Sequence, residues 1–221
     1  MTLKLKGSTS GSVSIDAPAS TAGGADRTLT LPDDSSNGVI KTSTYPSSIQ
    51  VLEQFWTPCD GSTIATSKGN VTVQNVTAYV DISESYVDLT GSVLTYTPPT
   101  GTTQVIYEFQ YAYSAHDTTG YTHHKLFLGG VEVTDARKSE SEVQYLNTNV
   151  YYKWGFNIGG TANAATGRVE SWTSGKEIKW QLRDHSTGND GFAHRITHWD
   201  GSDVTDFYTK PSVGITAIGA A

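Results

Sequence analysis

Histidines are the side chains in this sequence best suited to metal binding or acid–base chemistry, and the chain has six of them. His194 and His198 are four residues apart, which would suit a metal pair on a helix. Residues 192–199 are predicted to form a strand, however, where that spacing separates two side chains by about 13 Å. His123 and His124 are adjacent and would point to opposite faces of a strand. The spacing therefore predicts no zinc site.

Other side chains with catalytic or ligand chemistry also lie close together. Ser114, His116 and Asp117 supply the residue types of a hydrolase triad, but nothing around them resembles a nucleophile elbow or an oxyanion loop. The acidic loops 184–190 and 200–206 could offer oxygen ligands to Ca²⁺, although neither has EF-hand spacing. Turn formation explains their composition equally well, so both explanations stay open. We expect no enzyme activity, no catalytic or metal-binding residues and no cofactor.

Aromatic side chains offer a different chemistry, because an exposed ring can stack on a sugar. The candidates for such a site are Trp172, Trp199 and Tyr208. The same rings could fill a sandwich core or a subunit interface, which is the more frequent use of aromatic residues. A host surface glycan is the partner that this hypothesis predicts.

Charge and hydropathy exclude several classes of partner. Lys plus Arg number 15 against 22 Asp plus Glu, which gives a net charge of −7, and no basic run occurs. We therefore expect no nucleic-acid binding through phosphates. The apolar runs are too short for a membrane span or a secretion signal, so we expect no membrane insertion. The single cysteine excludes an intrachain disulfide.

The element that must position any site is the stretch 104–113. Its apolar side chains follow at strict two-residue spacing, which predicts a half-buried strand with one aromatic face. Residues 149–158 alternate in the same way and are the predicted partner strand. Together these strands are expected to form the core or a face for oligomerisation, with the residues Tyr107, Phe109, Tyr111, Tyr113, Tyr152, Trp154 and Phe156.

After residue 64 the residue pattern predicts many short strands, separated by turns that contain Gly, Pro, Asn and Asp. Gly129-Gly130 between two apolar runs predicts a two-residue hairpin. No helical periodicity is present. The sequence therefore predicts an all-β protein, an antiparallel β-sandwich of about ten strands over 64–221, most plausibly a jelly roll. Residues 45–63 are expected to form a hinge or collar, either as short helical turns or as an irregular strand.

Residues 1–44 contain no aromatic residue and are predicted to form an extended β-arm. Their apolar anchors, spaced as faces of brief strands, are Leu3, Leu5, Val13, Ile15, Leu29 and Leu31. Each contributes at most about 2 kcal/mol on burial, whereas ordering the backbone costs about 1–2 kcal/mol for every residue. The arm should not fold alone. We expect it to add strands to neighbouring chains, the alternative being that it lies across its own domain.

Several short sequence motifs resemble motifs in structural proteins of marine tailed phages, especially cyanophages. In the arm they are L-K-L-K-G-S-T-S-G-S-V-S-I-D-A-P at 3–18 and T-L-T-L-P at 28–32. In the remainder they are L-E-Q-F-W-T-P-C-D-G-S at 52–62, T-Y-T-P-P-T-G-T at 95–102, V-T-D-A-R at 133–137 and G-I-T-A-I-G at 214–219. The resemblance covers nearly the whole chain.

The resemblance implies a virion protein assembled in the host cytoplasm. It would be a tail fibre or a capsid-attached fibre or knob, with a head like the jelly rolls of complement C1q and tumour necrosis factor. The arm would dock on other virion proteins, and the head would form a homotrimer and contact the host surface. A capsid decoration or cement protein and a lectin-like carbohydrate-binding module are the alternatives. The resemblance brings no catalytic residues with it.

Overall fold

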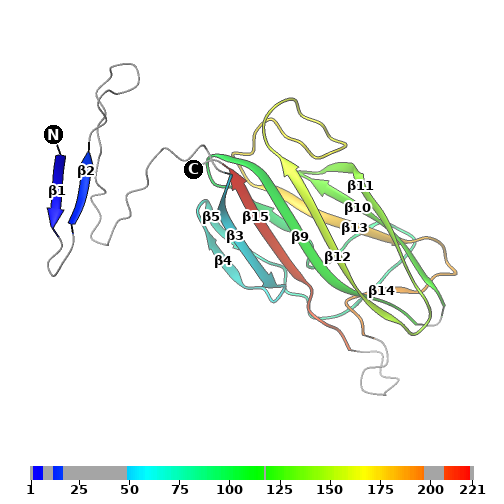
Figure 1. Ribbon diagram of the computed structural model, residues 1–221. Coiled ribbons are helices and arrows are strands. Elements are labelled where there is room, and N and C mark those ends of the chain that lie inside the picture. The colour runs from blue at the N-terminus through cyan, green and yellow to red at the C-terminus, as the bar shows by residue number, and fades with distance from the viewer. Residues whose placement is uncertain (1, 7–11, 17–48, 117, 197–206, 220–221) are drawn as a thin grey trace. The chain divides into compact units, whose positions relative to one another are not determined.

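A computed structural model describes residues 2–6, 12–16, 49–116, 118–196 and 207–219 of the chain (Figure 1). These residues form fifteen strands, and none of them is helical. The chain divides into two compact units, Met1–Pro46 and Ser47–Ala221. The described part of the chain contains no helix that could cross a membrane.

The first unit contains an antiparallel pair of strands. These are β1 (Thr2–Lys6) and β2 (Ser12–Asp16). Their register pairs Leu3 with Ile15 and Leu5 with Val13. Two of the three expected strand segments of the arm are therefore strands, and they pair with each other. The third segment, with Leu29 and Leu31, lies outside the described residues.

One sheet of the second unit is built around its longest strand, β9. Its strands are β3 (Gln50–Pro58), β6 (Val80–Asp81), β9 (Thr102–Ala115), β12 (Asn147–Asn157), β14 (Gly191–Ala193) and β15 (Ser212–Gly219). The order is β3-β15-β9-β14-β6, and β12 also pairs with β9. The expected pairing of the two aromatic strands is confirmed, because β12 runs antiparallel to β9 over eleven residue pairs.

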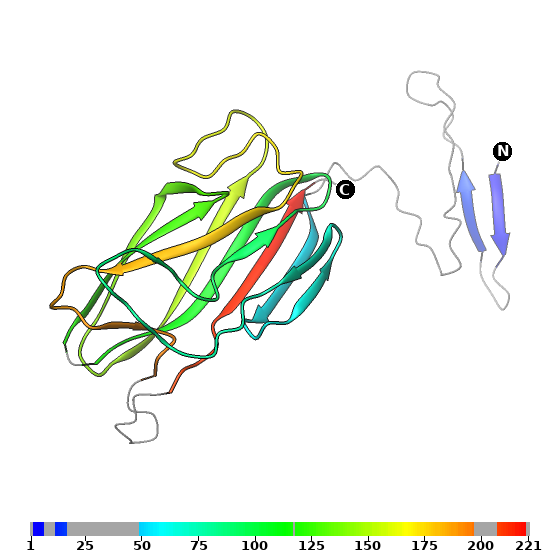
Figure 2. The ribbon, with the colours of Figure 1, turned by 180° about the vertical axis from the view of Figure 1, so that it is seen from behind.

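The second sheet faces the first (Figures 1 and 2). Its strands are β7 (Val87–Asp88), β8 (Leu94–Tyr96), β10 (Gly120–Leu128), β11 (Val131–Glu142) and β13 (Lys176–Asp184). The order is β11-β10-β13-β7, and β8 also pairs with β13. A separate hairpin joins β4 (Thr63–Thr66) to β5 (Gly69–Thr72). All of these strand pairs are antiparallel, so the predicted antiparallel sandwich of the jelly-roll type is confirmed, and the described residues of the second unit form thirteen strands where about ten were expected.

Aromatic side chains fill the space between the sheets. Tyr107, Phe109, Tyr111 and Tyr113 point inward from β9 and are at most 1% exposed. Tyr152 of β12 reaches across the core to Trp180 of β13, with ring centroids 4.4 Å apart. Phe156 is buried as well, and Trp154 is half-buried, with its indole N–H donating to the Thr166 carbonyl at 3.1 Å. Because the sandwich uses these rings for its own core, any surface that binds further copies of the chain must lie elsewhere.

Of the two forms expected within 45–63, helical turns or an irregular strand, the described residues take the strand. Residues 50–58 are the strand β3, which pairs with β15 along nearly its full length. Phe55 packs edge-on against the buried Tyr96, with centroids 6.2 Å apart. Residues 49–63, the described part of this stretch, contain no helical turn. The stretch belongs to the sandwich because β15 offers it a complete ladder of backbone hydrogen bonds.

The predicted hairpin at Gly129-Gly130 is confirmed, with φ angles of 57° and 81°. Leu128 and Val131 pair directly on either side of it. We expect Gly130→Ala to lower the free energy of unfolding by about 1 kcal/mol, since an L-residue is strained at this φ. Gly188→Ala is the matched control, because Gly188 is not left-handed and an added Cβ meets nothing closer than 4.0 Å. Urea denaturation measures both. Equal stability of the two variants would contradict the expectation.

Candidate functional site

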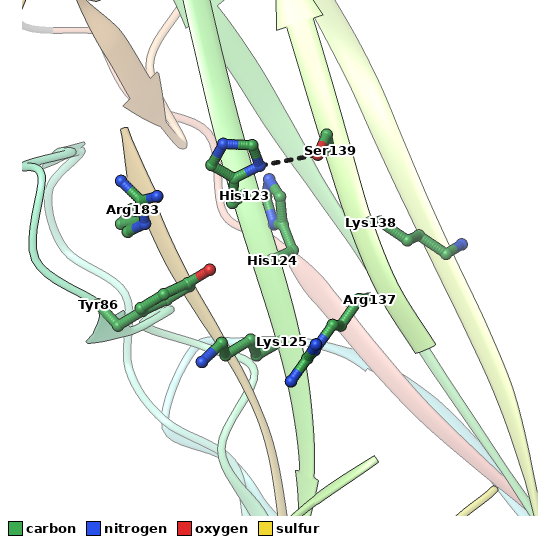
Figure 3. Close-up of a pocket in the computed structure, with 8 residues that line it drawn as sticks. All are labelled: Tyr86, His123, His124, Lys125, Arg137, Lys138, Ser139 and Arg183. Atoms are coloured by element: carbon green, nitrogen blue, oxygen red, sulfur yellow. Dashed lines mark hydrogen bonds between the residues drawn. The ribbon is translucent and has the colours of Figure 1, made fainter. Parts of the chain in front are cut away.

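A pocket of about 470 Å³ opens on the outer face of the sheet β11-β10-β13 (Figure 3). The residues that line it are Tyr86, His123, His124, Lys125, Arg137, Lys138, Ser139 and Arg183. Most of them carry a positive charge or a ring nitrogen. In a chain of net charge −7, this is an unusual local concentration of basic groups.

Strand alternation places the lining residues. On β10 the even-numbered residues are buried, and His123 and Lys125 point outward between them. Arg183 stands directly opposite His123 on β13, and Ser139 stands opposite it on β11. Three strands that are distant in sequence thus bring their outward side chains together.

A β-bulge makes the pocket possible. The register between β10 and β11 shifts between His124 and Leu126, which pair with Lys138 and Val133 respectively. Residues 134–137 of β11 therefore have no direct partner on β10 and bow away from it, opposite Lys125. The gap lets the edge of the buried His124 line the pocket (Figure 3).

The cations are only partly neutralised. Glu132 accepts from Nε of Arg137 at 2.7 Å and lies 3.6 Å from the Lys125 ammonium. The hydrogen bond from Arg137 lowers the pKa of Glu132, which keeps it ionised. Arg183 donates instead to the backbone carbonyls of Asp184 and His185. Among the described residues, neither Arg183 nor Lys138 has a carboxylate partner.

Tyr86 forms one wall of the pocket. The Lys125 ammonium lies 4.3 Å and the Arg183 guanidinium 5.4 Å from the centre of its ring. Both are cation–π distances. The Lys138 ammonium leaves the pocket and lies 4.8 Å over the Tyr152 ring (Figure 3). Lys125 and Arg183 are therefore held in place by an uncharged group and keep their charge available.

His123 adds a hydrogen-bonding group. Its Nδ1 lies 2.8 Å from the Ser139 hydroxyl and its Nε2 lies 2.9 Å from Nδ1 of His185. Desolvation lowers its pKa, and the neighbouring Arg183 and His185 lower it further. The Ser–His pair has the composition of a nucleophile and its base, but within the described residues no carboxylate orients His123. The arrangement suits binding of an anion better than catalysis.

The structure contradicts the expected exposure of Trp172. Its ring is 4% exposed, and its indole N–H donates to the Tyr96 carbonyl at 2.9 Å. It is a core residue, because the segment after β12 folds back over the sandwich. Tyr208 is 39% exposed and forms an isolated bridge with Arg195. Trp199 lies outside the described residues.

The histidines are placed differently from the prediction. His194 is in a left-handed conformation with φ 68°, so it ends the short strand β14 instead of lying within a strand over 192–199. Its side chain is buried, and its Nε2–H donates to the Thr90 carbonyl at 2.8 Å. His198 lies outside the described residues. Over the described ranges, no three His, Cys, Asp or Glu side chains are grouped as metal ligands.

Of the triad-like residues, the structure describes Ser114 and His116. Ser114 is fully buried on β9, and the His116 ring packs edge-on against Tyr145 with centroids 5.6 Å apart. Asp117 is outside the described residues. In the loop after β13, Asn189 accepts from the Ser186 backbone N–H at 3.2 Å, which is turn chemistry. The loop 200–206 is outside the described residues.

A second surface feature was missed in the sequence. Trp56 of β3 and Tyr151 of β12 are 47% and 49% exposed, and their ring centroids are 6.5 Å apart. They meet across β15 and β9, the two strands between β3 and β12. Gly214 of β15 leaves room for the Trp56 ring, because a Cβ there would come within 2.4 Å of it. The Tyr151 hydroxyl donates to Glu108. The alternation of β3 and β12 would have placed both rings outward, but it could not have shown that they meet.

No protein-family model matches the sequence, and no curated protein matches it. Solved structures similar to this chain include one of the Gt strain of infectious bursal disease virus, 8% identical over 97% of this chain with a TM-score of 0.37. One of the Gx strain is also 8% identical, over 98% of this chain, with a TM-score of 0.34. This chain spans about 50% of the length of each. A structure from a marine algae virus of the order Picornavirales is 11% identical over 94% of this chain and 87% of that one, with a TM-score of 0.19. At these TM-scores the likenesses carry no argument about function.

Proposed function

We propose that this protein is a non-catalytic structural component of a virus particle, anchored by residues 1–44 and displaying the β-sandwich. The observation that carries the proposal is that the sandwich completes its own core. The buried apolar cluster of the described residues runs from Cys59 to Ile215, all within the second unit, and we expect that unit to fold on this core without the arm. The arm forms a separate unit. A segment that the domain does not need for folding is available for docking on another protein.

The sequence resemblance supports the finer part of the proposal. It implies a tail fibre or a capsid-attached fibre or knob, assembled in the host cytoplasm and present in the virion, with a capsid decoration protein as the alternative. Homotrimer formation rests on the resemblance as well, since the broad aromatic face is buried in the core. The exposed pair of Trp56 and Tyr151 is the surface we assign to contact between copies.

Removal of residues 1–46 tests the anchoring role. We expect the remaining chain, 47–221, to keep its unfolding temperature within a few degrees, because its core is intact. Light scattering should give about three times the monomer mass for the full chain and for 47–221 alike. Only the full chain should sediment with particles produced by a host that expresses the two versions.

Each readout can fail separately. Incorporation of 47–221 into particles at the level of the full chain would overturn the anchoring role. A monomer at micromolar concentration would remove the homotrimer and leave the anchoring role standing. A carbohydrate-binding module is the second candidate function, and the basic pocket is the observation that favours it.

A further inference from the structure

The basic pocket carries more positive charge than its own carboxylate can balance. Lys125, Arg137 and Arg183 point into or across it, and Glu132 is the one carboxylate that pairs with any of them among the described residues. Arg137 uses Nε for Glu132 and is 58% exposed, which leaves its terminal amino groups for a ligand. An arrangement of fixed, incompletely paired cations favours an anionic ligand.

The pocket also offers groups that recognise hydroxyls and the flat faces of a ring. The Ser139 hydroxyl and the His123 ring line the pocket and are hydrogen-bonded to each other, and the row continues beyond the lining residues to the His185 ring. Tyr121 extends this row, with its ring centroid 5.1 Å from that of His123 and 5.0 Å from that of His185. Alternating aromatic and hydroxyl-binding groups beside cations suit an acidic sugar better than a bare inorganic anion.

A nucleic acid fits the site less well. The chain has a net charge of −7, which repels a long phosphate backbone. Carboxylates limit the positive area along β13, where Asp88 and Glu177 both pair with Lys179. The positive area is therefore short, and its volume of about 470 Å³ is within the range for ligands of small-molecule size.

We propose that the pocket formed by β10, the β11 bulge and β13 binds a short segment of acidic saccharide that carries sulfate or carboxylate groups. Lys125, Arg137 and Arg183 hold the charged groups. Ser139 and the row of His123 and His185 bind the hydroxyls, and Tyr121 packs beside the sugar ring. The inference goes beyond the virion role and does not depend on it.

Calorimetric titration of the full chain with three matched sugars tests the proposal. The probes are a galactose disaccharide that is sulfated, a galacturonate disaccharide and a neutral galactose disaccharide, with a thymidine oligonucleotide as a fourth probe. We expect at least one of the two acidic sugars to bind with a Kd of about 0.1–1 mM and the neutral one not to bind. The identity of the acidic sugar that binds shows whether the pocket recognises a sulfate group or a carboxylate group.

Two charge-matched double variants decide whether the pocket is responsible. Lys125→Gln with Arg137→Gln should weaken binding at least about tenfold. Lys153→Gln with Lys68→Gln removes the same charge from exposed positions on β12 and in the β4–β5 turn, outside the lining, and should leave Kd within about twofold. Thermal unfolding of both variants checks that they are folded.

Three results would overturn the proposal. The first is no binding of either acidic sugar up to about 10 mM. The second is an equal loss in the two double variants, which would mean that only overall charge matters. The third is binding of the oligonucleotide more tightly than the sugars, which would assign the pocket to nucleic acid. None of these results bears on incorporation into particles, so the virion role would be unaffected.

Discussion

Acidification is expected to destabilise the sandwich through two buried histidines. His124 and His194 are at most 1% exposed, and desolvation lowers their pKa values to about 3 and about 4 respectively. In each ring Nδ1 is buried without a hydrogen-bond partner among the described residues. Protonation would therefore place a charged N–H in the core with nothing to accept from it.

The direction of the pH effect follows from proton binding. In the unfolded chain both histidines have a pKa near 6.5, so below that pH the unfolded state binds more protons than the folded state. Stability from these groups is fully present above pH 6.5 and is lost as the pH falls towards their folded pKa values. As the pH falls from 6.5 to about 4, each histidine should lower the free energy of unfolding by about 3 kcal/mol.

Urea denaturation at a series of pH values measures this effect. His194→Asn keeps a residue that tolerates the left-handed conformation and should reduce the slope of stability against pH by about 1.4 kcal/mol per unit between pH 6 and 4.5. If His194→Asn and the original chain have the same slope, His194 is not buried in its neutral form.

Asp184 is expected to act in the opposite direction. It is 3% exposed at the end of β13, and burial raises its pKa to about 7, helped by the charges of Asp190, Asp81 and Glu84 and opposed by the Gly191 N–H. The folded state thus holds a proton that the unfolded state has released above about pH 4. The contribution of Asp184 is fully favourable below its unfolded pKa and is lost as the pH rises through 7.

The substitution Asp184→Asn should therefore stabilise the protein at alkaline pH. At about pH 8 the free energy of unfolding should rise by about 4 kcal/mol, and at about pH 4 it should hardly change. The same variant should steepen the loss of stability on acidification, because the opposing proton uptake is gone. Asp135→Asn, at an exposed position on β11, is the control and should have little effect at either pH.

A direct titration separates this explanation from a packing effect. Carbon NMR of the Asp184 carboxyl should show a midpoint near neutral pH. A midpoint near 4, together with unchanged stability of Asp184→Asn at pH 8, would contradict a buried carboxyl of raised pKa.

The sequence predicted the features of the fold that depend on local pattern. Alternating aromatic residues identified β9 and its partner β12, and two adjacent glycines identified the β10–β11 hairpin. These predictions succeeded because side-chain period and positive φ are properties of a few consecutive residues. The sequence left Trp172 as either an exposed sugar-binding ring or a core ring, and it could not decide between them because the ring is buried against residues distant in sequence, such as Tyr96.

The basic pocket could not have been predicted in the same way. Lys125, Arg137 and Arg183 are single cations in the sequence and meet only through the register of three strands and the bulge in β11. The alternation around His123 and Lys125 indicated that both point outward, which is the one signal that was present. Register between strands is decided by the whole sheet and not by any local segment.

Cross-linking from the arm in assembled particles tests the anchoring role most directly. A photo-activated amino acid at Lys4 or Ser14 would be introduced into a mixture of isotopically labelled and unlabelled chains. If the arm lies beside another virion protein, cross-links should join it to a different polypeptide. If it lies beside a neighbouring copy, cross-links should join labelled to unlabelled chains. Cross-links confined to the same chain, with the arm attached only to its own sandwich, would contradict an anchoring arm and the virion role proposed for this protein.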